Sequence, residues 1–209
     1  MLEDAIYINV PRGIEFINEK APCVSSLCWS QASTAPRCDS VPHIGLFRVA
    51  DEGSQHAMRI ALFEPDIPQN LGAFIRLSAC LDVPLDIVEP CGFPLDDRRI
   101  RRVAMDYYDL ATLVRHDSWS AFCRARPAGR LVLLTTRAEQ RFPEIAFETT
   151  DILLCGRESA GVPDHVHAAA DLSLRIPLQK GARSLNVAMA ASMVLSEGLR
   201  QNSGFARLT

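Results

Sequence analysis

The sequence predicts an α/β domain with a mostly parallel β-sheet flanked by helices. The runs Leu131–Leu134 and Ile152–Cys155 are apolar at every position, as strands buried on both faces of a parallel sheet are. From Met58 onward, short strand-like runs alternate with helical segments over short connections. This alternation is typical of parallel sheets covered by helices.

The predicted elements follow in order along the chain. Asn70 is a favourable N-cap for the first helix, and Asp96 or Asp97 for the second. The predicted strands cover residues 59–63, 85–88, 111–114, 131–134, 152–155 and 172–176. The predicted helices cover residues 71–81, 98–105, 118–124, 163–170 and 185–200.

The charge is distributed unevenly along the 209 residues. The formal net charge is −3, so no overall basic excess indicates a nucleic-acid binder. Residues 1–57 carry four basic and seven acidic residues, whereas residues 58–209 carry 18 of each sign, and 17 of those 18 basic residues are arginine. Arginine binds phosphate bidentately and stacks on bases, so a neutral domain can hold a local RNA site. A GC-rich genome would produce the same arginine bias.

The first 57 residues lack sustained periodicity, and serine and proline interrupt any helix or strand pattern. We expect a disordered or non-native extension there, a domain over residues 58–202 and a short tail over residues 203–209. Two alternatives stay open: Met58 is the true start of the chain, or the extension binds a metal or a regulator. The candidate metal ligands are Cys23, Cys28, Cys38 and His43. Their spacing fits no common zinc pattern, so we expect no metal.

The cysteines and the chain start indicate a cytoplasmic protein. The seven cysteines are odd in number, and several lie within apolar patterns, so we expect free thiols. No apolar stretch follows the acidic start, which argues against a signal peptide. The longest run of apolar residues and serine, Val187–Leu195, is too short to span a bilayer, so we expect no membrane association.

Unusual polar residues and glycines gather in three loops that follow predicted strands, at residues 70–76, 156–163 and 176–186. Open α/β sheets bind ligands at the carboxyl ends of their strands, so the loops form one candidate site. Taken singly, Asn70 and Ser184 can be helix caps and the glycines ordinary turn residues. The usual dinucleotide fingerprint, the P-loop lysine motif and the Gly-x-Ser-x-Gly elbow are missing.

The three loops resemble the ordered motifs of the SPOUT (SpoU-type) RNA ribose methyltransferases. The matching residues are Glu64-Pro65-x-Ile67-Pro68-x-Asn70-x-Gly72-x-x-x-Arg76, then Gly156-x-Glu158-x-x-Gly161-x-Pro163, then Ile176-Pro177 with Ser184-Leu185-Asn186. The resemblance runs from about Met58 to Gln201. The segment from Glu89 to Tyr107 is most like the smallest members, which methylate the wobble ribose of leucine tRNAs.

The resemblance implies a fold, a cofactor and partners. The family sheet ends in a deep trefoil knot, against the general rule for protein chains. The family binds S-adenosylmethionine in the knot and acts as a homodimer. For this chain the resemblance implies 2′-O-methylation of tRNA nucleotide 34, with the tRNA anticodon stem-loop as the partner.

The resemblance also assigns roles to residues of this chain. The implied catalytic residues are Asn70, Arg76, Glu158, Ser184 and Asn186. The implied cofactor-binding residues are Leu134, Thr135, Gly156, Ile176, Leu178 and Ser184. Arg157 and Ala160 depart from the family pattern where relatives often have proline and arginine, and Ala188 departs where many have serine.

Arg76 is an awkward base, because arginine keeps its proton at neutral pH. We expect it to hold the adjacent RNA phosphate and stabilise the developing alkoxide. The implied RNA-binding residues are Arg98, Arg99, Arg101, Arg102 and Tyr107, with Tyr108 as an alternative stacking residue. A solvated helix paired with nearby aspartates is the plain interpretation of the arginines.

Other functions stay open. A catalytically inactive SPOUT-like RNA-binding protein would need no intact Asn70 or Arg76. A flavodoxin-like nucleotide-binding module would share the α/β sheet without the methyl donor. A methyltransferase that acts on another RNA ribose would keep the same residues.

Overall fold

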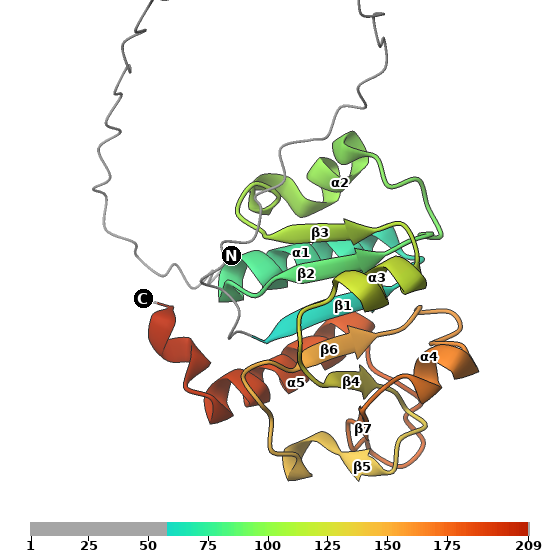
Figure 1. Ribbon diagram of the computed structural model, residues 1–209, viewed down its shortest axis with the longest axis vertical. Coiled ribbons are helices and arrows are strands. Elements are labelled where there is room, and N and C mark those ends of the chain that lie inside the picture. Colours follow the sequence, from blue (N-terminus) through green and yellow to red (C-terminus); the bar gives the residue numbers. More distant parts are fainter. Residues whose placement is uncertain (1–57, 209) are drawn as a thin grey trace, which may run out of the picture. The chain divides into compact units, whose positions relative to one another are not determined.

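Figure 1 shows the computed structural model of the chain, which describes residues 58–208 apart from the side chains of residues 97–99. The extension expected over residues 1–57 lies outside the described residues. The two alternatives for this segment are a start of the chain at Met58 and a metal or regulatory site at Cys23, Cys28, Cys38 and His43. The described residues test neither of them.

A seven-stranded parallel sheet forms the centre of residues 58–208, in the order β3-β2-β1-β6-β4-β7-β5. The strands are β1 (Arg59–Phe63), β2 (Leu85–Val88), β3 (Leu113–His116), β4 (Leu131–Leu134), β5 (Gln140–Arg141), β6 (Ile152–Cys155) and β7 (Leu172–Arg175). The predicted parallel α/β sheet is therefore confirmed. The implied knot is a property of the chain path rather than of the strand order, and it stays a prediction.

Helices cover both faces of the sheet (Figure 1). They are α1 (Pro68–Leu81), α2 (Asp97–Ala104), α3 (Trp119–Ala125), α4 (Asp164–Ala168) and α5 (Val187–Gln201), with short 3-10 helices η2 (Met105–Tyr107), η3 (Phe142–Glu144) and η4 (Gly204–Arg207). The ends of the predicted helices and strands move by at most three residues. Strand β5 escaped prediction because its two exposed polar residues carry no apolar signal.

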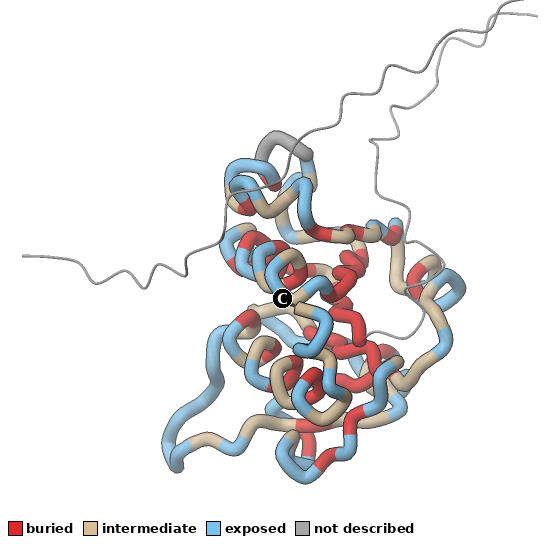
Figure 2. Tube along the Cα trace, turned by 90° about the vertical axis from the view of Figure 1, so that its left-hand side faces the viewer, coloured by how far each residue is buried: buried red, intermediate tan, exposed pale blue. Residues whose placement is uncertain are grey.

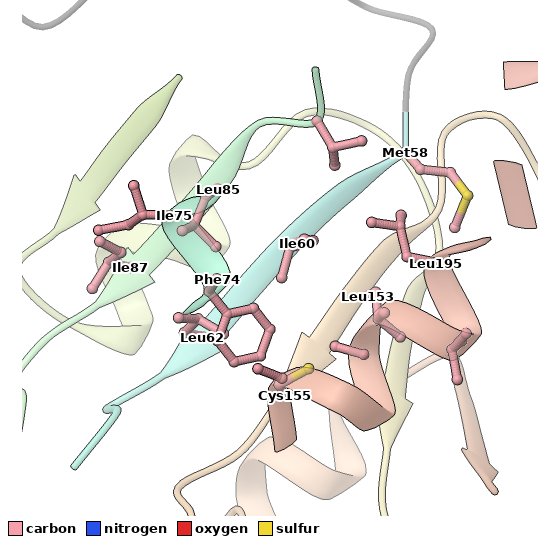
Figure 3. Close-up of a cluster of buried hydrophobic side chains, with 14 of the residues drawn as sticks. Met58, Ile60, Leu62, Phe74, Ile75, Leu85, Ile87, Leu153, Cys155 and Leu195 are labelled. Atoms are coloured by element: carbon pink, nitrogen blue, oxygen red, sulfur yellow. The ribbon is translucent and has the colours of Figure 1, made fainter. Parts of the chain in front are cut away.

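The central strands bury both of their faces. Along β1, Ile60 and Leu62 face the core beneath α1 and α5, whereas Ala61 and Phe63 face the core beneath α3 and α4. Figure 3 shows the first of these cores, where Phe74 of α1 lies beside Leu62 and Cys155 of the sheet and Leu195 of α5 belongs to the same cluster. Figure 2 shows how burial concentrates in the middle of the domain while the outer loops are exposed.

The start of α1 differs from the prediction, because Asn70 is not its N-cap. Ile67 holds the N-cap position without a side-chain hydrogen bond, and Pro68 starts the helix. Proline suits this position because its φ is preset and its missing N–H would have no helical partner. Asn70 therefore lies within the first turn, where its side chain is free for another contact.

The start of α5 also differs, because Asn186 and not Ser184 is the N-cap. The Asn186 Oδ1 accepts hydrogen bonds from the backbone N–H groups of Ala188 at 3.0 Å and Met189 at 3.3 Å. Helix α3 begins at Trp119, one residue later than predicted, because Ser118 is its N-cap and its Oγ accepts from the backbone N–H of Ala121 at 3.2 Å.

Residues 203–208, expected as a tail, carry η4 and pack against the domain. The Arg207 guanidinium donates to the backbone carbonyls of Leu81 at 3.4 Å and Asp82 at 3.2 Å.

None of the helices between residues 58 and 208 combines the length and apolar character needed to cross a bilayer.

The thiol of Cys155 in β6 should not react with alkylating reagents in the folded protein. Burial raises the pKa of its thiol to about 12, and the thiolate is the reactive form of cysteine. At about pH 8 we expect iodoacetamide to label the exposed Cys80 and Cys123 and to leave Cys155 unmodified. Peptide-resolved mass spectrometry measures this, with the denatured chain as the control. Equal labelling of the three thiols in the folded protein would contradict the buried position of β6.

Candidate active site

A cavity of about 840 Å³ opens beyond the carboxyl ends of β4, β6 and β7. It is lined by every predicted catalytic or cofactor-binding residue except Arg76: Asn70, Leu134, Thr135, Gly156, Glu158, Ile176, Leu178, Ser184 and Asn186. The three sequence motifs thus meet around one cavity, as parallel strands with their carboxyl ends at one edge require.

A chain of side-chain hydrogen bonds links the three motifs. The Asn70 Nδ2 donates to the Glu158 Oε1 at 2.9 Å, and the Asn70 Oδ1 accepts from the Asn186 Nδ2 at 2.8 Å. Asn70 is only 9% exposed. Asn186 can serve α5 and Asn70 together because an amide carries both an acceptor and a donor. Asn70, which the sequence presents as a possible cap, is therefore only a link between motifs, whereas Asn186 is both a cap and a link.

Asp66 is a site residue that the sequence analysis missed. Its backbone N–H donates to the Glu158 Oε2 at 3.1 Å, and its own Oδ1 accepts from the backbone N–H of Glu158 at 3.1 Å. Its Oδ2 accepts from the backbone N–H of Ser159 at 3.3 Å and from the Ser159 hydroxyl. Asp66 stands at an unspecified position of the first motif, so its acidity was the only signal in the sequence.

The Asp66 and Glu158 carboxyl groups shift each other's titration. A hydrogen bond from the Glu158 side chain lowers the pKa of Asp66 to about 2. Burial, together with the neighbouring Asp66, raises the pKa of Glu158 above its ordinary value of 4.5. The two shifts have opposite signs, so Asp66 ionises before Glu158 as the pH rises.

The loop that carries Glu158 closes on itself. The backbone N–H of Arg157 donates to the carbonyl of Gly161 at 3.0 Å, and the reverse bond measures 2.9 Å. A Cβ on Gly156 would lie 2.6 Å from the carbonyl carbon of Gly161, so only glycine fits there. The Arg157 side chain forms an ion pair with Glu64. Proline, which relatives often have at position 157, could not donate the first bond; arginine supplies it.

Arg76 lies away from this cavity. It is exposed on α1, with its Nη2 3.6 Å from the Met105 sulfur and its guanidinium 4.7 Å from the centre of the Tyr107 ring. The close approach of α2 to α1 brings Met105 and Tyr107 there. Gly72 permits this approach, since a Cβ at its position would lie 2.7 Å from the Val103 carbonyl oxygen. Within the described residues, the cavity lining does not include Arg76.

The predicted RNA-binding residues lie on and after α2. Arg101 contacts the Tyr108 ring at 4.4 Å and forms an ion pair with Asp109 at 2.8 Å. Arg102 is exposed. The side chains of Arg98 and Arg99 lie outside the described part of the structure, so their contact with RNA stays a prediction. In residues 58–208, no cluster of three or more His, Cys, Asp or Glu side chains is arranged to hold a metal ion.

The sheet and the cavity define a class of protein: parallel α/β domains that hold a small ligand in loops beyond the carboxyl ends of the strands. Residues 57–196 match the SpoU rRNA methylase family, and the chain belongs to that family.

Several curated relatives match the chain over nearly their whole length. The chain is 54% identical to a tRNA (cytidine(34)-2′-O)-methyltransferase of Ancylobacter novellus, over 72% of this chain and 96% of that protein. It is 38% identical to the protein with the same description from Escherichia coli, over 69% of this chain and 93% of the relative. The predicted resemblance is confirmed.

Solved structures match the fold. One, described as giving structural insights into the 2′-OH methylation of C/U34 on tRNA, aligns with a TM-score of 0.67 at 37% identity, over 72% of this chain and 99% of that chain. Another, an AdoMet-bound rRNA methyltransferase from Sinorhizobium meliloti, aligns with a TM-score of 0.63 at 25% identity, over 70% of this chain and 57% of that chain.

Replacing Glu158 with glutamine should remove a pH dependence of stability. Because the pKa of Glu158 is raised in the folded state, folding disfavours its ionised form. The wild-type chain should therefore lose stability relative to E158Q as the pH rises from 4.5 through the raised pKa. Urea unfolding of both proteins across this range measures the difference.

Glu197 offers a control of opposite sign. Hydrogen bonds from Arg200 and Gln201 lower its pKa to about 2. The wild-type chain should therefore lose stability relative to E197Q as the pH falls from 4.5 toward 2. Two outcomes would contradict the raised pKa of Glu158. In one, the difference in free energy of unfolding between wild type and E158Q does not change with pH. In the other, the wild type gains stability relative to E158Q as the pH rises.

Proposed function

We propose that this chain transfers a methyl group from S-adenosylmethionine to the ribose 2′-hydroxyl of tRNA nucleotide 34. The observation that carries the proposal is the 54% identity over nearly the full length of a tRNA (cytidine(34)-2′-O)-methyltransferase. The hydrogen-bonded network of Glu158, Asn70 and Asn186 supports it, because it joins all three motifs at one cavity.

The cavity fits the proposed cofactor. Its volume of about 840 Å³ lies within the range of small-molecule sites. Leu134, Ile176 and Leu178 give it apolar walls, while Thr135 and Ser184 add hydroxyl groups. When bound, S-adenosylmethionine supplies a methyl group on a positively charged sulfur. Since that charge disappears during transfer, an apolar wall favours the transition state.

The partly buried hydrogen-bond network positions the loops and not the reacting atoms themselves. Asp66 and Glu158 fix the second motif to the first, and Asn186 fixes the start of α5 to Asn70. Transfer to a hydroxyl group gains mainly from correct placement of the two reactants. We assign to Arg76 the role of holding the RNA phosphate and stabilising the developing alkoxide, with the proton passing to phosphate or water.

Mapping of 2′-O-methylated nucleotides tests the function directly. tRNA from a strain that lacks this chain should lose the methyl group at nucleotide 34, and we propose leucine tRNAs as the substrates. The purified chain with tritiated S-adenosylmethionine should restore it. A methyl group gained at a different ribose would support another RNA ribose as the substrate, and no transfer to any RNA would support an inactive RNA-binding protein.

Arg76→Ala should lower kcat by about 10²–10³-fold, the loss typical when one transition-state donor is removed. Affinity for S-adenosylmethionine should be unchanged, because Arg76 lies outside the cavity lining of the described chain. Single-turnover methylation and calorimetry measure the two quantities. Arg141→Ala removes another exposed arginine, near η3, and serves as the control. Near-normal turnover of Arg76→Ala would refute its catalytic role.

We also propose a homodimer. Four apolar side chains are exposed on or just before α1 and α5: Ile67 and Leu185 precede the two helices, and Met189 and Met193 lie on the first half of α5. The Asn70–Asn186 hydrogen bond holds these two helix starts together. Met189 and Met193 are 60% and 44% exposed and lie one helical turn apart on α5. An apolar surface of this kind is typical of an interface, and a second copy of the chain would cover it.

Met189→Glu should convert the dimer into a monomer, because a second copy cannot bury the new charge. Light scattering coupled to size exclusion measures the mass. Phe205→Glu places the same charge at an exposed apolar position beyond the far end of α5 and should leave the dimer intact. A wild-type chain that is monomeric and active contradicts the proposal.

We place the anticodon stem-loop against α1 and α2, where Arg76, Arg101 and Arg102 are exposed. The guanidinium of Arg76 meets a sulfur atom and a ring, and neither neutralises its charge.

We also propose a cytoplasmic location, because the proposed substrate is tRNA and Cys80, Cys91, Cys123 and Cys155 are free thiols.

A further inference from the structure

A second cavity, of about 350 Å³, lies beyond the carboxyl end of β1. The loop that carries Glu158 separates it from the first cavity, since Arg157, Ala160, Gly161 and Val162 line both. The start of α3 and the start of α4 form its other walls, through Trp119 and His165. None of the proposed catalytic or cofactor-binding residues lines it, within the described part of the chain.

The inner surface of the second cavity is aromatic and apolar. Phe63 and Val162 are buried, and Trp119 is partly exposed. The Trp119 ring meets the Phe63 ring edge-on at 5.8 Å and packs on Phe122 at 5.3 Å. These contacts hold the indole in place, so it forms a fixed surface against which a flat ring can stack.

The polar wall of the second cavity is an ion pair. The side chains of Glu64 and Arg157 are 17% and 39% exposed. Because the two charges balance, the wall does not favour a phosphate or another ion. It presents a carboxylate acceptor beside guanidinium donors, and the buried Arg157 Nε has no hydrogen-bond partner among the described residues. A flat, neutral ring with donors and acceptors on its edge satisfies both surfaces.

We propose that this second cavity binds a nucleobase of the tRNA anticodon loop, adjacent in the RNA to the nucleotide that is methylated. The inference rests on the proposed function, which supplies a single-stranded RNA loop as the substrate. Proteins read such loops by splaying the bases, stacking them on aromatic rings and bonding their edges. One loop of protein separates the second cavity from the cavity proposed for S-adenosylmethionine, so a base bound here would lie close to the nucleotide that receives the methyl group.

The fluorescence of Trp119 tests the proposal. The chain has two tryptophans, Trp29 and Trp119, so a Trp29→Phe full-length protein reports on Trp119 alone. Adding an anticodon stem-loop RNA should quench its emission. RNAs in which one nucleotide of the loop lacks its base should each be compared. Removing the base on one particular side of the methylated nucleotide should abolish the quenching and weaken binding about ten-fold.

The same protein separates failure of this proposal from failure of the proposed function. Methylation of nucleotide 34 by Trp29→Phe tests the function, whereas the Trp119 emission tests the cavity. Unchanged emission on addition of RNA that the protein binds and methylates overturns the second cavity as a base site. Equal quenching by every abasic RNA also overturns it, because contact with the sugar-phosphate backbone alone would then explain the signal.

A variant provides an independent measurement. Trp119→Leu keeps an apolar side chain at the start of α3 but removes the stacking surface. It should bind the stem-loop about ten-fold more weakly and bind S-adenosylmethionine as the wild type does. Cys123→Ser, on an exposed position of the same helix, is the matched control and should change neither affinity. Wild-type RNA affinity in Trp119→Leu overturns the proposal; if Trp119→Leu does not fold, the abasic RNAs decide.

Discussion

The side-chain amide of Asn70 holds together three loops that follow different strands. It donates to Glu158 and accepts from Asn186 in an almost fully buried position. Loss of either bond would leave a buried polar atom unpaired, at a cost of about 1–3 kcal/mol. Asp66 adds a second link between the same loops, so the shape of the cavity depends on pairings between residues about 90 positions apart in the chain.

The strands could be predicted because burial on both faces leaves a continuous apolar run, which needs no knowledge of distant partners. The caps could not. The local rule selects the best capping side chain near a helix start, and it selected Asn70 and Ser184. Pro68 starts α1 two residues before Asn70, and Asn186 displaces Ser184 at α5. The same polar side chains thereby become available to the site.

The candidate site was predictable as a set of residues and not as a geometry. Asp66 looked like an ordinary turn residue, since its contacts with Glu158 and Ser159 form only when β1 and β6 lie side by side. The second cavity could not be predicted either, because Phe63, Trp119 and Arg157 come from three separate segments of the sequence. The sequence also could not reveal that Arg76 would lie on an exposed face beside Met105 and Tyr107.

Several of the charged groups in residues 58–208 pair with one another. Arg59 pairs with Asp86, Arg130 with Asp151 and Arg157 with Glu64, so these arginines serve the fold or the loops. Arg76 is surrounded by a thioether and a phenol ring, which hold its guanidinium without cancelling its charge. Net charge therefore says little about RNA binding in this chain. The arginines suited to phosphate are those whose neighbours in the folded domain leave them charged and exposed, and only the fold determines which these are.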